Sequence, residues 1–191
     1  MTSFPWLRVV GLLSAGLAAC TGDDTLVELA AVDGSRHVPQ QVGAGQVHVI
    51  VFVSHECPIA NGYAPTLGQL AAGWAGQGVR LFVVYVDPDL TLEQARTHGR
   101  DYALPGTLLL DPSHRLAAPL AVSRTPEAVV LSAAGVVYRG RIDDQWQDLG
   151  VRIPEASVHD LRDAVAVARR GGIVPLPHPS AIGCLLPEPA R

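Results

Sequence analysis

Residues 47–60 read Val47-His48-Val49-Ile50-Val51-Phe52-Val53-Ser54-His55-Glu56-Cys57-Pro58-Ile59-Ala60. The first seven are apolar and mostly β-branched apart from one histidine, which is typical of a buried strand. A cysteine shortly after such a strand, followed by a proline that can open a helix, is the layout of a thiol redox centre. In a Cys-x-x-Cys motif a second cysteine would stand in place of Ala60. The site therefore works with one local thiol, or its partner lies elsewhere in the chain.

The composition favours a single folded domain with extra segments. The chain has 191 residues, of which 48% are hydrophobic and 17% charged, so it can bury a substantial core. Its formal net charge is −4 and the sequence has no basic patch, so we expect no nucleic-acid partner. None of the 14 basic residues is lysine, which excludes lysine Schiff-base chemistry.

The N-terminus has the pattern of an export signal. Residues 9–17 are apolar, follow a segment with one positive side chain, and form a run too short to span a bilayer. The run ends in Leu17-Ala18-Ala19-Cys20, which resembles a bacterial lipobox, in which the cysteine is lipidated and begins the mature protein. An ordinary signal peptide, with Cys20 left as a free thiol, is the alternative. Because Thr21 and not aspartate follows, the lipoprotein pattern predicts an outer-membrane anchor facing the periplasm.

The cysteine count then becomes informative. Lipidation of Cys20 leaves two thiols, Cys57 and Cys184, and export places both in an oxidising compartment where such a pair usually bonds or cycles. Cys184 lies in a proline-rich tail that cannot be helical and tends to be extended. A bond between them would close a long loop and stabilise the fold by roughly 5 kcal/mol in the chain-entropy model. Three interpretations remain open: a cycling redox pair, a permanent structural bond, and a tail thiol that is unpaired or pairs between molecules.

The rest of the pattern alternates between strands and helices, starting with an apolar segment at 26–32. We expect strands at 47–53, 79–86 and 106–110, helices at 61–74, 90–102 and around 114–120, a hairpin of 128–131 with 136–141, and a closing helix at 157–170. Thr91 and Ser157 are the expected N-caps of two of these helices. Two successive strand-helix units favour a parallel sheet at the core.

This order of elements resembles the thioredoxin-like superfamily. Four separated segments narrow the resemblance to exported bacterial redoxins, which are related to the alkyl hydroperoxide reductase and thiol-specific antioxidant proteins. They are Ser54-His55-Glu56-Cys57-Pro58-Ile59-Ala60-Asn61, Thr125-Pro126-Glu127-Ala128, Tyr138-Arg139-Gly140-Arg141-Ile142-Asp143-Asp144 and Gly183-Cys184. The resemblance implies an α/β thioredoxin-like fold with a central mixed sheet flanked by helices. It divides the chain into a lipoprotein signal at 1–19, a tether at 20–25, a redoxin domain at 26–171 and a tail at 172–191.

The resemblance also implies roles for individual residues. Pro126 would be the cis-proline that faces the active cysteine, with the backbone of Thr125 available to an extended substrate, although an ordinary trans proline remains possible. Cys184 would be the resolving thiol, since a resolving cysteine on a C-terminal tail is common in redoxins. For Cys57 the residues themselves add a physical reason, because a helix N-terminus favours thiolate. Glu56 would oppose the thiolate charge and a protonated His55 would support it. The alternative is that Cys57 is a buried structural residue that acts as a small hydrophobic side chain.

Two other activities have partial support. A peroxidatic site has Pro-x-x-x-Thr-x-x-Cys; here Ser54 can replace the threonine hydroxyl and Arg124 can supply an arginine, but Ile50 stands in place of the proline. A thioredoxin-like copper chaperone has a second cysteine where Asn61 stands, and the mature chain has no methionine to bind Cu(I). Copper binding through the two thiols and one of His55 or His178 is therefore weakly supported.

Other polar residues are interpreted as structural. We expect surface or satisfied core positions for the scattered histidines, namely His37, His48, His98, His114 and His159. The residues Arg139, Arg141, Asp143 and Asp144 are expected to form a solvated strand end with local ion pairs.

Together these observations predict an exported, lipid-anchored thiol-disulfide oxidoreductase without metal or other cofactor. Cys57 is the expected nucleophile and Cys184 the expected resolving thiol, while Ser54, Glu56, Pro58, Arg124, Thr125 and Pro126 are expected to shape the site. The partners would be protein thiols and disulfides, or peroxide, together with the membrane through Cys20. A thiol peroxidase and a non-catalytic binding scaffold or copper-handling module are the alternatives.

Overall fold

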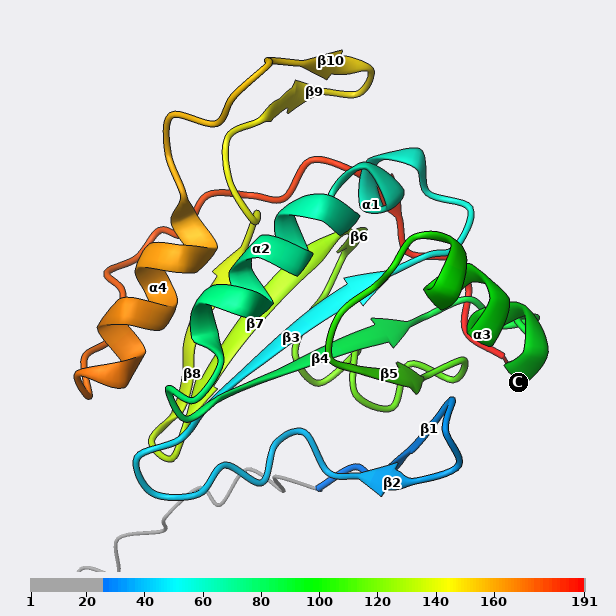
Figure 1. Cartoon of the computed structure of the whole chain (residues 1–191), viewed down its shortest axis with the longest axis horizontal. Helices are drawn as coiled ribbons and strands as arrows, with labels where there is room; N and C mark the ends of the chain where they lie inside the picture. Colours follow the sequence, from blue (N-terminus) through cyan, green and yellow to red (C-terminus); the bar gives the residue numbers. More distant parts are fainter. Residues whose placement is uncertain (1–25, 191) are drawn as a thin grey trace, which may run out of the picture.

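A computed structural model describes residues 26–190 of the chain (Figure 1). The signal at 1–19 and the tether at 20–25, with Cys20, lie outside the described residues. The elements in chain order are β1 Leu29–Ala31, β2 Arg36–His37, β3 Val47–Val53, α1 Pro58–Gly62, α2 Ala64–Trp74, β4 Val79–Tyr85, α3 Leu92–Asp101, β5 Thr107–Leu110, β6 Arg124–Thr125, β7 Glu127–Ser132, β8 Gly135–Gly140, β9 Trp146–Asp148, β10 Val151–Arg152, α4 Asp160–Arg169 and β11 Cys184–Leu185.

The main sheet has the order β2-β1-β5-β4-β3-β7-β8 and is mixed. The strands β3, β4 and β5 run parallel to their neighbours in this trio, whereas β7 pairs antiparallel with β3 and with β8. Two short two-stranded sheets, β9 with β10 and β6 with β11, lie apart from it. The predicted α/β class with a central mixed sheet is therefore confirmed.

The central strand β3 is buried on both faces. All seven of its residues are buried, and consecutive side chains of a strand point to opposite faces. Val49 and Val51 face a core that also contains residues of all four helices, while Ile50 and Phe52 face a second core on the other side. This explains why the run is apolar apart from His48 and does not alternate with polar residues.

The helices pack on one face of the sheet and an irregular chain covers the other. In Figure 1 the helices α2 and α4 lie in front of the sheet. The opposite core is closed by Val27 and by Leu116, Ala117 and Val122 from the irregular segment between β5 and β6. Within residues 26–190 no helix is both long and apolar enough to cross a membrane.

Several local predictions are confirmed. The strand at 47–53 has the predicted bounds, and the hairpin of β7 and β8 turns where it was expected, after Ser132. The helix α3 begins after Thr91, whose hydroxyl accepts a hydrogen bond from the backbone N–H of Gln94 at 3.3 Å. The Gln94 side chain in turn accepts one from the backbone N–H of Thr91, completing a capping box.

Two of the predicted helices, at 61–74 and around 114–120, differ from the structure. The predicted helix at 61–74 is two helices, α1 and α2, which meet at Tyr63. The segment around 114–120 consists of turns, because His114 has a positive φ of 52° and the carboxylate of Asp111 accepts the backbone N–H groups of Leu116 and Ala117. Non-helical hydrogen bonds of this kind replace those of a regular helix.

The closing helix begins later than predicted, and Ser157 is not its N-cap. α4 starts at Asp160, while the backbone N–H and hydroxyl of Ser157 both donate to the carboxylate of Asp144. Asp144 and its neighbour Asp143 are buried, so the prediction of a solvated strand end is wrong for these two carboxylates. Asp143 accepts the hydroxyl of Tyr63 at 2.7 Å, and Arg141 pairs with Asp160 at 2.7 Å.

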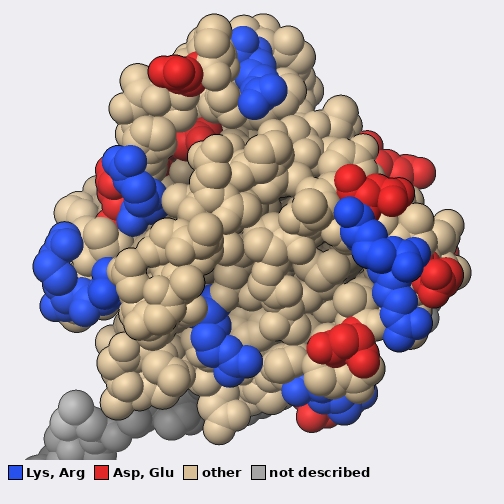
Figure 2. Space-filling view, viewed as in Figure 1, with Lys and Arg blue, Asp and Glu red and all other residues tan. Residues whose placement is uncertain are grey.

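Charged residues of both signs lie around the rim of the face that carries α2. Figure 2 shows this face with scattered basic and acidic side chains and a broad area of other residues between them.

Candidate thiol redox site

Cys57 is the N-cap residue of α1, and Pro58 is the first residue of that helix, as predicted. Its backbone is extended, and its carbonyl accepts the first helical hydrogen bond from Asn61 at 3.0 Å. The short loop after β3 thus places the thiol at the carboxyl end of a buried strand and the start of a helix. The residue is 1% exposed, so the sulfur is covered by other parts of the chain.

One of the covering parts is the segment that precedes β7. The Thr125-Pro126 peptide bond is cis, as the resemblance implied, and the Cys57 thiol donates a hydrogen bond to the Thr125 carbonyl at 3.1 Å. The carboxylate of Glu127 holds this segment in place by accepting the backbone N–H groups of Ser123 at 2.8 Å and Arg124 at 3.3 Å. Thr125 itself is fully buried, and its hydroxyl has no hydrogen-bond partner among the described residues.

The C-terminal tail brings Cys184 to the same place. β11 pairs antiparallel with β6, with Cys184 opposite Thr125 and Leu185 opposite Arg124. Gly183 permits this approach, because a Cβ atom at that position would overlap the Thr125 carbonyl oxygen. The tail thus reaches Cys57 through a strand pairing of its backbone.

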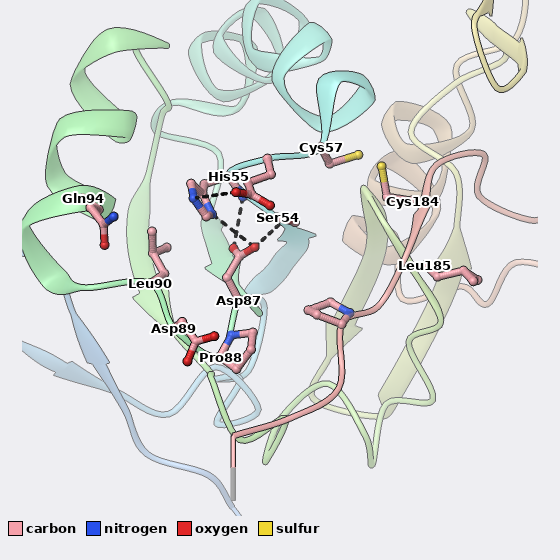
Figure 3. Close-up of a pocket in the computed structure, with 12 residues that line it drawn as sticks. Ser54, His55, Cys57, Asp87, Pro88, Asp89, Leu90, Gln94, Cys184 and Leu185 are labelled. Carbon is pink, nitrogen blue, oxygen red and sulfur yellow. Dashed lines mark hydrogen bonds and ion pairs between the residues drawn. The ribbon is translucent and has the colours of Figure 1, made fainter.

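The two thiols meet between these elements. Both cysteines are free thiols, and they lie near enough for each to shift the pKa of the other. Figure 3 shows the two sulfur atoms side by side, one from the start of α1 and the other from the tail. The structure therefore brings together the two residues that the sequence selected as a pair, although 126 residues separate them in the chain.

The surroundings of the two sulfurs give them different acidities. Burial by itself would raise the pKa of Cys57, but hydrogen bonds from the Cys184 thiol and from the backbone N–H groups of Ala60 and Cys184 outweigh it, and the pKa is lowered. Burial and the neighbouring Cys57 raise the pKa of Cys184 to about 11. Of the two groups, Cys57 is the one that ionises first and is the better leaving group.

A cavity of about 610 Å³ opens beside the sulfurs. It is lined by Ser54, His55, Glu56, Cys57, Asp87, Pro88, Asp89, Leu90, Gln94, Cys184, Leu185 and Pro187 (Figure 3). Its walls come from the carboxyl ends of β3 and β4, from the start of α3 and from the tail. This is the edge at which parallel strands of an open α/β sheet present their functional residues.

Asp87 organises the loop that leads to Cys57. Its carboxylate accepts the Ser54 hydroxyl at 2.5 Å and the backbone N–H of His55 at 3.1 Å, and it lies 3.2 Å from Nδ1 of the His55 ring. The sequence prediction missed this residue. A signal was present, because Asp87 follows a strand parallel to the one that precedes Cys57, and the ends of such strands meet at one edge.

A second network supports the same loop from α3. His98 lies between the Tyr85 hydroxyl and the Asn61 side chain, at 2.9 Å from each, and the Asn61 amide donates to the His55 carbonyl at 3.0 Å. Burial lowers the pKa of His98. The expectation of a satisfied core histidine agrees with these contacts, which also link α3 to the cysteine loop.

The other predicted site residues lie in different positions. Glu56 lines the cavity with an exposed side chain, whereas the Arg124 guanidinium donates to the Gly183 carbonyl at 3.2 Å and does not line the cavity. Ser54 directs its hydroxyl to Asp87. Among the described residues, neither the Ser54 hydroxyl nor the Arg124 guanidinium makes a hydrogen bond to the Cys57 sulfur, because each is bonded to another group.

Metal binding has no preformed centre in the part of the chain that is described. Residues 26–190 contain no cluster of three or more histidine, cysteine or acidic side chains arranged around a common point. His178 lies elsewhere, with Nδ1 accepting the backbone N–H of Arg139 at 3.1 Å.

Solved structures share this fold. A hypothetical protein of Sinorhizobium meliloti 1021 is 23% identical with a TM-score of 0.74, covering 87% of this chain and 92% of its own. An uncharacterized conserved protein of Geobacillus kaustophilus is 22% identical with a TM-score of 0.68, covering 84% and 87%. A secreted disulfide oxidoreductase of Mycobacterium tuberculosis is 20% identical with a TM-score of 0.54, covering 76% and 96%. At these identities the likeness establishes the fold, which is thioredoxin-like as predicted.

The sequence comparisons are more specific about ancestry than about activity. Residues 25–142 match the family described as AhpC/TSA. Among curated proteins, none matches this sequence. The family match includes β3, Cys57 and the Thr125-Pro126 segment, and it stops before the tail that carries Cys184.

Proposed function

The chain belongs to the AhpC/TSA family, and from that premise we propose that it is a thiol-disulfide oxidoreductase whose redox pair is Cys57 and Cys184. The observation that carries the proposal is the pairing of β11 with β6, which sets the Cys184 thiol against the Cys57 sulfur. Dithiol-disulfide exchange requires a nucleophilic thiol with a lowered pKa and a second thiol beside it.

The proposed reaction has two steps. The Cys57 thiolate attacks one sulfur of a substrate disulfide, forming a mixed disulfide and releasing the first substrate thiolate. The Cys184 thiol, after losing its proton, attacks the Cys57 sulfur and expels the second substrate thiolate. The enzyme dithiol thereby supplies two electrons to the substrate and becomes a disulfide, and the reverse sequence oxidises a substrate dithiol.

The other site residues have supporting roles in this proposal. Pro58 starts the helix whose backbone N–H groups face the thiolate, and the Thr125 carbonyl accepts a hydrogen bond from the Cys57 thiol. Asp87 and Ser54 fix the loop before Cys57. Glu56 and Arg124 contribute at the cavity wall and through the tail, respectively.

We further propose that the protein is exported and held at the cell envelope by a lipid on Cys20, facing the periplasm. The support is the sequence pattern of residues 1–20, which separates the signal and tether from the domain and tail that the resemblance indicates. Mass spectrometry of the mature N-terminus tests this. An acylated Cys20 is expected, and an unmodified Cys20 or a cut elsewhere would contradict the anchor.

A redox titration tests the proposed reaction. The full-length chain with Cys20→Ser, which leaves only the two site thiols, is equilibrated in glutathione buffers and analysed by mass spectrometry. We expect a Cys57–Cys184 disulfide that forms and breaks within the buffered range. A midpoint below about −300 mV would identify a structural bond and overturn the cycle.

Activity measurements separate the alternatives. Reduction of a protein disulfide such as that of insulin should require both Cys57 and Cys184. Rapid consumption of peroxide that is lost in Cys57→Ser but retained in Cys184→Ser, without insulin reduction, would favour a thiol peroxidase instead.

A further inference from the structure

The tail that carries Cys184 is attached mainly through its backbone. The carbonyl of Pro179 accepts the backbone N–H of Arg141 at 3.2 Å, the N–H of Leu186 donates to Ser123 at 3.2 Å, and that of Ala190 donates to Pro112 at 2.8 Å. Its apolar anchoring is partial: Val174, Ile182 and Leu186 are only partly buried against the two cores, and the side chains of Leu176 and Leu185 are 80% and 71% exposed. A segment held in this way belongs to the part of a fold that opens most easily.

The attached tail covers the reactive sulfur. Cys57 is 1% exposed while the tail is in place, and Cys184 stands directly at its sulfur. A protein disulfide must approach the attacking sulfur closely and nearly in line, and the Cys184 side chain lies beside that sulfur (Figure 3). The better nucleophile is therefore shielded, and the half-buried Cys184 is the poorer one because its pKa is raised.

The tail also occupies a backbone edge beside the nucleophile. β6 and β11 form a sheet of their own, in which Thr125 uses its backbone to pair with Cys184. An exposed strand edge next to a reactive group can orient any extended chain, because the main-chain hydrogen bonds do not depend on sequence. Only one chain at a time can occupy this edge.

We propose that the segment Gly183–Leu186 occupies, within the molecule, the strand edge on which an extended cysteine-containing segment of a partner protein binds, and that it must leave β6 before Cys57 can react with that partner. The proposal rests on the proposed function only in taking a protein as the substrate. The tail then acts both as the carrier of the resolving thiol and as a competitor of the substrate.

The way the tail fits predicts which partner segments bind. The strand pairing requires glycine at position 183, because the Thr125 carbonyl leaves no room for a Cβ atom there. In contrast, the side chain of Leu185, which directly follows Cys184, points to solvent. A partner segment that pairs in the same register needs glycine immediately before its cysteine and tolerates most residues immediately after it. The binding chemistry is that of an added β-strand.

Alkylation of Cys57 tests the shielding directly. In full-length protein with Cys20→Ser and Cys184→Ser, the rate with iodoacetamide is measured over a pH series, so that fully ionised thiolates are compared. Gly183→Ala should raise this limiting rate about tenfold or more, because it releases the tail. Gly68→Ala is the matched control, since a Cβ there meets no atom within 4 Å. Equal rates for the two variants would overturn the shielding.

A second tail variant guards against a folding defect. Leu186→Pro removes the N–H that donates to Ser123 and leaves Gly183 intact. If Gly183→Ala does not fold, Leu186→Pro should show the same rise in alkylation rate, and an unchanged rate would count against the proposal.

A peptide tests the shared edge. A synthetic peptide with the sequence of residues 179–187 is added to the Gly183→Ala, Cys184→Ser, Cys20→Ser protein in a buffer with glutathione disulfide, which takes up the two electrons that are released when two thiols join. It should form a disulfide with Cys57, whereas the same peptide carrying Gly183→Ala should not. Equal reaction of both peptides would overturn the edge-sharing. A protein whose Cys57 is uncovered as predicted but which reduces no disulfide would refute the proposed function and leave this inference standing.

Discussion

The thiol of Cys57 donates a hydrogen bond to the backbone carbonyl of Thr125 at 3.1 Å, and Thr125 is the residue that pairs with Cys184. The nucleophile and the attachment point of the tail are therefore joined through one residue. Changes in the tail should therefore alter the pKa of Cys57, and changes near Thr125 should alter the pKa of both thiols.

Loss of the Cys184 thiol should raise the pKa of Cys57. Cys184→Ala removes a hydrogen-bond donor to the thiolate, whereas Cys184→Ser retains one, so the pKa should rise more in the alanine variant. In the wild type, thiolate should form at a pH below the ordinary cysteine pKa of about 8.5. The ultraviolet absorbance of the thiolate, followed against pH, measures this. A pKa that is the same in all three proteins would contradict the assigned donor.

Removal of the buried, unpaired Thr125 hydroxyl should separate stability from acidity. Thr125→Val deletes a buried hydroxyl that has no partner in the thiol form, so the free energy of unfolding should be unchanged or up to about 1 kcal/mol higher. Because the hydroxyl is placed to donate to the thiolate, the pKa of Cys57 should rise in the same variant. Urea unfolding and the thiolate titration check the two effects, and a lower pKa would refute this role.

Asp87→Ala should destabilise the protein. The substitution leaves the Ser54 hydroxyl and the backbone N–H of His55 without their acceptor, which costs about 1–3 kcal/mol of unfolding free energy. Asp89→Ala is the matched control, because that carboxylate lies two residues away and is exposed. Urea unfolding of both variants should show a clear loss only at Asp87. A comparable loss at both positions would indicate a general effect of acidic charge at the cavity.

Acid should destabilise the segment that leads into α4. Hydrogen bonds from Ser157 and Val158 lower the pKa of Asp144 to about 2, below the value of about 4 expected in the unfolded chain. The stabilisation by this carboxylate is therefore complete above about pH 4 and is lost as the pH falls toward about 2. Stability measured between pH 5 and about pH 2 should decline more steeply in wild type than in Asp144→Asn. Parallel curves would contradict the assignment.

The elements that were predicted correctly are those that can be recognised from their own residues, without knowledge of contacts to distant parts of the chain. The strand at 47–53 is apolar at every position but His48 because both of its faces are buried. Thr91 is followed three residues later by Gln94, a pair that marks a helix start by itself. The hairpin of β7 and β8 is likewise indicated by two short, mostly apolar runs with a glycine at the turn between them.

The elements that were missed depend on distant residues. The turns around 114–120 form because the Asp111 carboxylate takes backbone donors, and Ser157 fails to cap α4 because Asp144 holds it. Neither competing acceptor is visible in a periodicity pattern. Short strands such as β6 and β11 have no periodicity to detect, so the sequence indicated the partner of Cys57 by counting thiols but not the backbone pairing that delivers it.

The long chain separation of the two cysteines links redox state to the whole fold. A disulfide between Cys57 and Cys184 would enclose β4, β5, β7, β8 and all four helices in one covalent ring. In the chain-entropy model such a ring stabilises the folded state by roughly 5 kcal/mol. Because the thermodynamic cycle must close, the fold favours disulfide formation by the same free energy as the disulfide favours the fold. The difference in unfolding free energy between the dithiol and disulfide forms is thus an independent measure of how far folding shifts the protein's reduction potential.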